Sequence, residues 1–382
     1  MFNFTIHKTD GLARTGSIKT PHGIIKTPVF MPVGTKATVK TLSPQDLKNL
    51  QTQIILANTY HLFLRPGHKV IKKLGGLHKW MNWQHPILTD SGGYQVFSLG
   101  QEKGFTKNTD FKTSVKIDEN GVEFRSHIDG KKHYLTPKQA IEIQHDLGAD
   151  IIMAFDECAP ANSSKQYFKE AMQRTHNWLK HCINAHKSRT KTQALFGIVQ
   201  GGIHKNLRIE SAKFINDQNL PGNAIGGLAI GESKATMLAM IETTIPHLST
   251  KKPRYLMGVG TPEDLLECVE RGIDMFDCVH PTRLGRHGPF WHEHGRASIR
   301  NEKFKLDKSP LQKNCLCETC QDCSKSYLRH LIFENEILGL RLMTIHNLHF
   351  LLELMRQIHK HIEVKSFSKF KKDFLKKFHA KS

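Results

Sequence analysis

ALFGIVQGG, residues 194–202, is a short apolar run that ends in a polar side chain and a glycine pair, and a helical pattern follows it. This arrangement recurs along the chain and decides the fold. Its other copies are PVFMPVG (28–34), QIILANTY (53–60), PILTDSGGY (86–94), DIIMAFDEC (150–158), NAIGGLAIG (223–231), RYLMGVGTP (254–262) and IDMFDCVHPT (273–282). Apolar strands that alternate with helices in this way are typical of a parallel sheet.

The runs lie between residues 28 and 282, and their number and length match a (β/α)8 TIM barrel of about 250 residues. An open doubly wound sheet would give a similar pattern, so the barrel is the favoured of two alternatives. Thr136-Pro137 and Thr261-Pro262 mark helix starts, because a threonine cap and a first-turn proline favour initiation. We predict an α/β barrel at residues 1–285 and a C-terminal subdomain at 286–382 that completes it.

Three segments stand outside the repeat. Residues 101–116 are polar and aperiodic, which predicts a surface loop inserted into the barrel. Residues 324–363 look helical almost throughout, and Phe367, Phe370, Phe374 and Phe378 then follow one face of a lysine-rich final helix. The phenylalanines are best explained as residues that pack against the rest of the protein. The lysines either bind an RNA backbone or form a solvent-exposed face of the helix.

The composition indicates a globular protein with a polyanionic partner. Hydrophobic residues make up 38% of the 382, and 55 Lys and Arg against 35 Asp and Glu leave a formal charge of +20. Such an excess attracts phosphate, although solubility or free use of lysine would also produce it. Residues 1–14 lack a signal-peptide core, and no stretch reaches the roughly 20 apolar residues of a membrane span. We therefore expect a soluble, cytoplasmic protein without membrane segments.

Polar groups end several of the predicted strands. In a barrel these ends converge on one mouth, where the sequence places Asp90, Asp156, Gln200, Gly227, Gly258 and Asp277. A single aspartate after a strand is more often a helix cap, but three at equivalent positions indicate chemistry. Crowded carboxylates suit a nucleophile, a general acid and a hydrogen-bond acceptor, as in cleavage of a glycosidic bond.

The sequence indicates a binding site for a planar ligand less strongly than it indicates the carboxylate cluster. The glycine pairs 92–93, 201–202 and 226–227 let backbone amides approach a planar ligand, or they form tight turns. Tyr94 and Met257 are placed to sandwich a purine, and ordinary wall packing explains them equally well.

Four of the eight cysteines lie between Cys315 and Cys323. This spacing is too tight for a disulfide framework and natural for metal thiolates, so we expect no disulfides. Cys315, Cys317 and Cys320 with one histidine make a tetrahedral set for structural zinc, and Cys323 is the spare. Spacing alone leaves His330, His346 and His349 as candidates for the fourth ligand.

Longer motifs carry a resemblance that spans the chain from end to end. They are TDSGGYQVFSL (89–99), MAFDECAP (153–160), GIVQGG (197–202), IGGLAIGE (225–232), YLMGVGTPEDL (255–265), MFDCVHPTR (275–283) and the cysteine motif, which closely resemble bacterial tRNA-guanine transglycosylase. The resemblance implies that guanine at the wobble position of tRNAs with GUN anticodons (Asp, Asn, His and Tyr) is replaced by 7-aminomethyl-7-deazaguanine (preQ1), in queuosine biosynthesis. It also implies a homodimer.

The same resemblance assigns roles to residues. It implies that Asp277 is the nucleophile that forms a covalent RNA intermediate and that Asp90 handles the base proton. It chooses His346 as the fourth ligand of one structural zinc ion, with Cys315, Cys317 and Cys320. The implied base-binding residues are Asp90, Ser91, Gly92, Gly93, Tyr94, Asp156, Gln200, Gly227, Leu228 and Met257. The implied RNA-binding residues are Gly258, Val259, Gly260, Thr261, Pro262, Glu263, Asp264, Thr282, Arg283, Leu284, Gly285 and Arg286.

Departures from the family pattern leave alternatives. The family usually has another residue where His280, Ile230 and Cys323 stand, and Ile230 lies near the substituent side of the base pocket. A queuine-accepting enzyme is therefore an alternative, although Cys158 favours the bacterial substrate. A non-catalytic RNA-binding subunit would lack the nucleophile, and a glycoside hydrolase would lack the cysteine motif and the basic surface.

Overall fold

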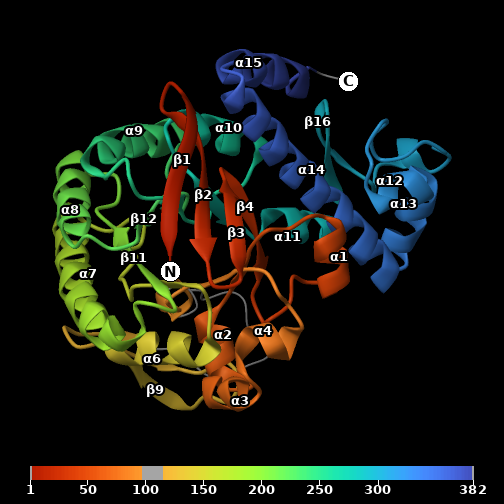
Figure 1. The fold of residues 1–382 in the computed structure, drawn as a ribbon. Coiled ribbons are helices and arrows are strands. Elements are labelled where there is room, and N and C mark those ends of the chain that lie inside the picture. Colours follow the sequence, from red (N-terminus) through yellow and green to blue (C-terminus); the bar gives the residue numbers. More distant parts are fainter. Residues whose placement is uncertain (1, 97–114, 381–382) are drawn as a thin grey trace.

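The computed structural model describes residues 2–96 and 115–380, and its centre is a closed barrel of parallel strands (Figure 1). Each barrel strand pairs with the next barrel strand, and the last, β14, pairs with the first, β4. The barrel is therefore closed, and the open-sheet alternative is wrong. The strands are β4 (Val29–Gly34), β5 (Ile55–Ala57), β6 (Ile87–Thr89), β10 (Ile151–Met153), β11 (Ala194–Val199), β12 (Gly222–Ile225), β13 (Arg254–Leu256) and β14 (Met275–Cys278).

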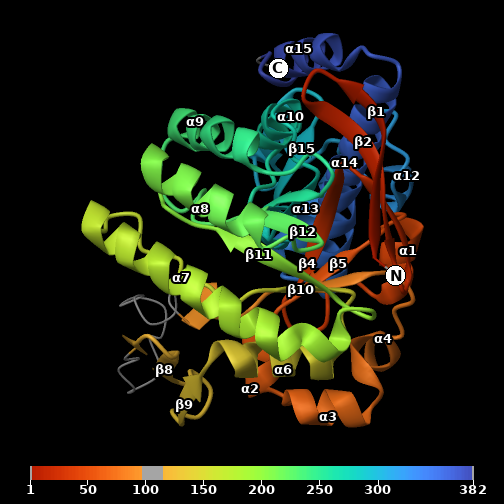
Figure 2. The ribbon, with the colours of Figure 1, turned by 60° about the vertical axis from the view of Figure 1, so that its left-hand side comes forward.

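Helices surround the barrel, and Figure 2 shows α7, α8 and α9 following one another around it. Thr136 caps α6 in a capping box with Gln139, and Thr261 caps α10, which confirms both predicted helix starts. The covering helices are α1 (Pro44–Asn49), α2 (Thr59–Leu64), α3 (His68–Lys73), α4 (Gly76–Met81), α6 (Pro137–Leu147), α7 (Lys165–His186), α8 (Lys205–Asp217), α9 (Lys234–Thr244) and α10 (Pro262–Glu270).

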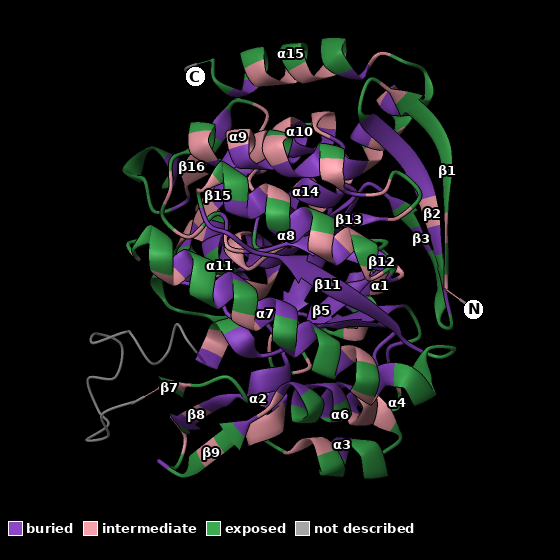
Figure 3. Ribbon diagram, turned by 90° about the vertical axis from the view of Figure 1, so that its left-hand side faces the viewer, coloured by how far each residue is buried: buried purple, intermediate pink, exposed green. Residues whose placement is uncertain are grey.

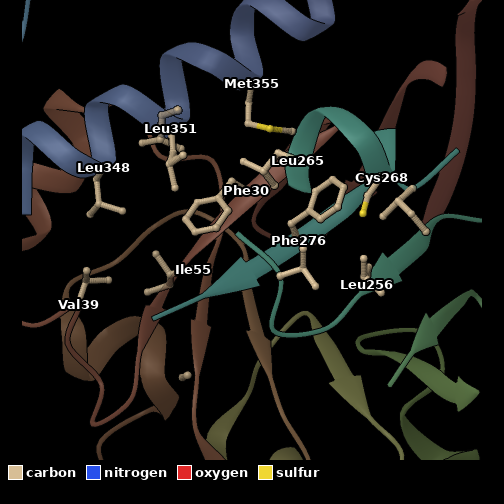
Figure 4. Packing of buried hydrophobic residues seen from close by; sticks show 14 of the residues in the cluster. Phe30, Val39, Ile55, Leu256, Leu265, Cys268, Phe276, Leu348, Leu351 and Met355 are labelled. Carbon is tan, nitrogen blue, oxygen red and sulfur yellow. The ribbon is translucent and has the colours of Figure 1, made fainter. Parts of the chain in front are cut away.

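Side chains alternate between the two faces of each barrel strand, as β4 illustrates. Val29, Met31 and Val33 join the cluster that fills the barrel, whereas Phe30 joins the cluster beneath the helices. Figure 4 shows Phe30 and Phe276 packed toward α10 and the long blue helix above them. The strands are buried on both faces (Figure 3), which explains why they read as continuous apolar runs.

Three antiparallel strands cover the amino-terminal end of the barrel: β1 (Asn3–Asp10), β2 (Ala13–Thr20) and β3 (Gly23–Thr27). Phe2 meets Phe196 of β11 edge to face, with the ring centroids 5.8 Å apart. Arg14 and Asp274, both buried, form an ion pair of 2.6 Å that ties β2 to the start of β14. The barrel floor is therefore closed by apolar packing and one buried ion pair.

The chain after the barrel forms α11 (His280–His287), the hairpin β15 (Pro289–His292) and β16 (Gly295–Ser298), and then α12 (Glu318–Asp322), α13 (Lys325–Phe333), α14 (Ile337–Glu363) and α15 (Phe367–Phe378). Helix α14 packs against α11 and β4 on the outside of the barrel (Figure 1). The predicted helix 324–363 is broken before α14, where Asn335 adopts a left-handed φ of 56°. The division at residue 285 stays a prediction.

Packing of the phenylalanines in α15 is confirmed. Phe367 and Phe378 are buried, and Phe370 and Phe374 pack against the same core. Lys371 pairs with Glu267 and Glu270 of α10, so this lysine holds the helix to the barrel.

The predicted insertion lies partly outside the described residues, namely at 101–114. Its last two residues lead into a small antiparallel sheet of β7 (Lys116–Ile117), β8 (Val122–Arg125) and β9 (Lys132–Leu135). Across the described ranges, no helix combines the length and the apolar character needed to span a bilayer.

Candidate active site and metal centre

A cavity of about 580 Å³ opens at the carboxyl ends of the barrel strands. The strand-end prediction is confirmed in its placement, because all six polar or glycine positions named for it line this cavity. The lining residues include Asp90, Asp156, Gln200, Gly227, Gly258 and Asp277, together with Ser91, Gly92, Tyr94, Cys158, Leu228, Ile230 and Met257.

Asp90 follows β6 and is held by the loop after β5. Its Oδ1 accepts hydrogen bonds from the backbone N–H groups of Thr59, at 2.8 Å, and Gly92, at 3.2 Å, and the Asn58 side chain donates to Oδ2. Burial raises the pKa of Asp90 to about 7 against the opposing effect of the Thr59 amide, and the nearby Asp277 carboxylate raises it further. Asp90 therefore titrates near neutral pH, as a proton-transfer group requires.

Asp156 follows β10 and shares a hydrogen bond with Gln200 from β11. Gln200 Nε2 donates to Oδ2 of Asp156 at 2.7 Å, and Ser91 Oγ donates to Oδ1 at 3.4 Å. Burial raises the pKa of Asp156 to about 6, although these hydrogen bonds lower it. Gly93 lies so close that a Cβ there would meet the Asp156 carbonyl oxygen at 2.7 Å. These residues form a buried hydrogen-bonding edge at one side of the cavity.

Asp277 lies in β14 and is oriented from β13. Tyr255 donates its phenol O–H to Oδ1 of Asp277 at 2.6 Å, and the backbone N–H of Gly258 donates to the same oxygen at 2.8 Å. Among the described residues no hydrogen bond reaches Oδ2. Burial raises the pKa of Asp277, and the bonds from Tyr255 and Gly258 counteract this shift. One carboxylate oxygen is thus anchored, while the other accepts no hydrogen bond from residues 2–96 and 115–380.

A buried guanidinium shapes the loop after β12. Arg208 of α8 is fully buried and donates to the carbonyl oxygens of Gly226, at 2.7 Å, and Gly227, at 3.0 Å. It also donates to the carbonyls of Gly202 and Val199. Gly227 has a φ of 63°, which favours glycine, and a Cβ there would lie 2.4 Å from Gln200 Oε1, so a side chain at this position would displace Gln200. The orientation of the Gly227 peptide is therefore imposed by Arg208.

Sequence reasoning missed Asn58, Tyr255 and Arg208. Asn58 directly follows β5, so the strand-end rule that found Asp90 would have found it as well. Tyr255 lies inside the barrel near the end of β13, where a polar ring among inward-facing residues was the available signal. Arg208 carried no signal, because an arginine within a helix normally reaches solvent.

The residues predicted to bind RNA divide into two groups. Gly258, Thr282, Arg283 and Arg286 line the cavity rim. The side chains of Val259, Pro262 and Leu284 are buried beneath this rim, and Thr261 and Asp264 bond to each other at the start of α10. Glu263 is partly exposed and Gly260 and Gly285 are buried in the backbone that supports the rim. The side chains placed to meet a ligand are therefore Arg283 and Arg286.

The predicted metal ligands come together in the C-terminal part. The Sγ atoms of Cys315, Cys317 and Cys320 lie 3.9, 3.6 and 3.3 Å from Nδ1 of His346, and all four residues are buried. The Nε2 atom of His346 lies 2.8 Å from the carbonyl oxygen of Trp291, to which its N–H donates, and this leaves Nδ1 free as a ligand. The group can hold one metal ion, and Cys323, His330 and His349 are not part of it.

Comparisons with known proteins agree over nearly the whole chain. The model of a protein family described as queuine tRNA-ribosyltransferase matches residues 9–380. A queuine tRNA-ribosyltransferase of Herpetosiphon aurantiacus is 55% identical over 377 residues, which cover 99% of this chain and 93% of that protein. Proteins of the same description from Caldanaerobacter subterraneus subsp. tengcongensis and Staphylococcus aureus are 54% and 52% identical, covering 96% of this chain and 94% and 93% of theirs.

Proposed function

Because this chain belongs to the queuine tRNA-ribosyltransferase family, and is thus a tRNA-guanine transglycosylase, we propose that it exchanges guanine for preQ1 at the wobble position of tRNAs with GUN anticodons. The observation that carries this proposal is the convergence of Asp90, Asp156 and Asp277 on one cavity. A purine edge, a ribose carbon and a transferable proton each need one such group.

Asp277 is the proposed nucleophile. Its anchored Oδ1 sets the orientation of the carboxylate, and Oδ2 attacks C1′ of the ribose as the bond from C1′ to N9 of guanine breaks. The product is an ester between Asp277 and the RNA, and the departing guanine takes up a proton. In the second step the incoming base attacks C1′ and the ester bond breaks. Two displacements retain the configuration at C1′.

Asp90 is the proposed proton-transfer group. It supplies the proton to the departing guanine and accepts the proton that the incoming base loses from its ring nitrogen. The pKa of about 7 supports this role, because the carboxyl is then present in both protonation states near neutral pH.

The edge formed by Asp156, Gln200 and the Gly227 amide is the proposed recognition site for the base. The carboxylate accepts hydrogen bonds from N1 and the exocyclic amine of a guanine-type base, and Gln200 and Gly227 donate to its O6. Adenine presents the opposite pattern and is rejected. Ser91, Gly92, Tyr94, Leu228 and Met257 complete this pocket, and Gly93 packs behind it against Asp156. Arg283 and Arg286 contact the tRNA at the rim, with the backbone of residues 258–264 and 282–286 beneath.

The incoming base is proposed to be preQ1, with queuine as the second candidate. Cys158 and Ile230 both line the cavity; Cys158 favours preQ1, and the departure at Ile230 keeps queuine as the alternative. A non-catalytic RNA-binding subunit is the weaker reading, since Asp90 and Asp277 are both in place.

The metal is proposed to be a single structural zinc ion. Three thiolates and one imidazole match the tetrahedral ligand set of structural zinc, and four protein ligands leave no position for a reactive water. We also propose a cytoplasmic homodimer. In the C-terminal segment the large apolar residues Leu306, Leu316 and Ile337 are 86, 80 and 77% exposed, and this exposure supports a second copy as the cover.

The experiment that tests the function measures release of labelled guanine from tRNA with guanine, preQ1 or queuine as the incoming base. Asp277→Asn is expected to abolish release and the denaturant-resistant adduct between protein and RNA. Asp217→Asn, an exposed aspartate at the end of α8, is the matched control and should retain both. An adduct that persists in Asp277→Asn would contradict the assignment of the nucleophile, and faster exchange with queuine than with preQ1 would contradict the proposed substrate.

A further inference from the structure

We propose that His22, His78 and Asp150 form a second metal site, for a divalent transition-metal ion, at the amino-terminal end of the barrel. His22 lies in the turn between β2 and β3, His78 in α4 and Asp150 directly before β10. Figure 1 shows α4 close to the lower end of β2. One ligand atom from each of the three residues lies within 4.8 Å of the other two. The fold thus gathers two imidazoles and a carboxylate from distant parts of the chain.

The separations already suit a shared ion. Nδ1 of His22 lies 2.8 Å from Oδ1 of Asp150, and Nε2 of His78 lies 3.2 Å from Oδ2. The two imidazole rings are stacked, with centroids 3.5 Å apart and planes inclined by 13°. Ligands bound at about 2.1 Å to one ion lie roughly 3.0 to 3.4 Å from each other. Because the lone pair of an imidazole nitrogen lies in the plane of its ring, one of the two rings must rotate out of the stack before both can bind a single ion.

Nε2 of His78 supplies a second observation. This atom is shielded from solvent, and within residues 2–96 and 115–380 no group is oriented to form a hydrogen bond with it. Its near neighbour is the Asp150 carboxylate at 3.2 Å, in an ion-pair contact whose alignment is poor. A metal ion bound between the two groups would replace this poorly aligned contact with a direct bond to each.

Backbone hydrogen bonds orient the Asp150 carboxylate, as they commonly orient carboxylates that bind metal ions. Its side chain is fully buried, and its oxygens accept hydrogen bonds from the backbone N–H groups of His22, at 3.1 Å, and Ile87, at 2.9 Å. Such bonds orient a ligating carboxylate and strengthen the site.

The ligand set selects the class of metal and its role. Two imidazoles and one carboxylate favour Zn²⁺, Co²⁺ or Ni²⁺ over Mg²⁺ or Ca²⁺. An adjoining cavity of about 650 Å³ has room for the waters that complete the coordination, while Lys79 on its wall weakens the attraction for a cation. Asp150 precedes β10 and Asp156 follows it, so the site lies at the opposite end of the barrel from the active-site cavity. The ion would therefore stabilise the fold by joining the amino-terminal sheet, α4 and β10.

The test is a Co²⁺ titration of the full chain whose Cys315, Cys317, Cys320 and His346 group is already loaded with zinc. We expect one further equivalent of Co²⁺ to bind, with a visible spectrum free of thiolate charge-transfer bands and with a higher Tm. His22→Asn and His78→Ala should each weaken this binding about tenfold or more. His85→Asn, an exposed histidine outside the group, is the matched control and should bind Co²⁺ as the unaltered chain does.

Failure to bind the further equivalent would overturn the proposal, as would equal binding by His22→Asn; the three residues would then be a hydrogen-bonded cluster only. Since the His22 side chain is 39% exposed in a turn, its variant decides the question even if His78→Ala does not fold. Metal content and Tm do not depend on base exchange, so the proposed function can fail while this site stands.

Discussion

At the scale of single residues, burial of the Asp90 carboxyl raises its pKa, and the hydrogen bonds that it accepts only partly offset this rise. Thr59 and Gly92 donate to one oxygen and Asn58 to the other, yet burial prevails and the pKa rises to about 7. Asp156, with a pKa of about 6, lies in the same cavity. The protons of the cluster therefore come off in steps that belong to the group rather than to one residue.

The first prediction concerns the pH dependence of base exchange. Asp90 must be ionised to accept the proton that preQ1 loses, so kcat/KM for preQ1 is expected to rise as the pH increases, with an apparent pKa between about 6 and about 7. Steady-state kinetics with preQ1 across this range would check it. A rate that stays constant from about pH 5 to about pH 8 would exclude Asp90 as the acceptor.

The second prediction concerns Tyr255→Phe. The substitution removes the 2.6 Å bond to Oδ1 of Asp277 and leaves the Gly258 amide as the remaining donor. A hydrogen bond to a charged group is worth about 1.5 to 3 kcal/mol, so kcat should fall by roughly one to two orders of magnitude while the KM for tRNA changes little. Tyr134→Phe, on the exposed strand β9, is the control that should leave both values unchanged. A rise in KM alone would mean that Tyr255 binds substrate and does not position the nucleophile.

At the scale of elements, the loops after β11 and β12 are joined by one side chain. Arg208 donates to four carbonyl groups, of Val199, Gly202, Gly226 and Gly227, and its burial lowers the pKa of the guanidinium to about 10. These loops carry Gln200 and the Gly227 amide. Helix α8 thus holds together, from outside the barrel, the two loops proposed to recognise the base.

The third prediction follows for Arg208→Met. The carbonyls of Gly202, Gly226 and Gly227 lose the guanidinium as a donor, while that of Val199 keeps the Gly226 amide, so the free energy of unfolding should fall by about 3 kcal/mol or more, and the KM for the incoming base should rise. Urea denaturation and base-exchange kinetics would measure the two effects. Lys205→Met, on the exposed face of the same helix, should change neither. An unaltered KM in folded Arg208→Met would mean that the Gly227 peptide keeps its orientation without the guanidinium.

A comparison of the helices and strands also shows which features could be predicted from the sequence alone. The strands and the three aspartates were predictable, because apolar runs and the groups that end them are local features. The break before α14 depends on Asn335 in a left-handed conformation, and a helical pattern on both sides hides it. Arg208 and Tyr255 act across the barrel, so their partners appear only when distant segments are brought together.

At the scale of the whole molecule, the cysteine group joins the C-terminal segments to the barrel. The cysteines lie around α12, whereas His346 belongs to α14, which packs against β4 and α11. The bond from His346 to the Trp291 carbonyl connects the group to β15 as well. Loss of a metal ion from this group should therefore destabilise the packing of α12, α14 and β15 as well as the four ligand residues.

The fourth prediction is that removal of this metal destabilises the protein. Structural zinc contributes several kcal/mol, so Cys320→Ser or chelation should lower the Tm by about 10 °C or more. Cys323→Ser is the control, since this cysteine lies outside the group and should leave the Tm unchanged. Differential scanning calorimetry would compare the three proteins. An equal Tm for Cys320→Ser and Cys323→Ser would show that the group holds no stabilising ion.

The first barrel strands to be synthesised are not the first to be paired and covered by their neighbours in the fold. Strand β4, among the first parts made, pairs with β14 on one edge and is covered by α14, which ends at Glu363. At ribosomal speeds of about 5 to 20 residues per second, β4 waits roughly 15 to 65 s for that cover. Until α14 is made Phe30 lacks this cover, and until β14 is made one edge of β4 has no strand to pair with. Chaperones that bind such segments during translation would therefore engage this protein early and release it late.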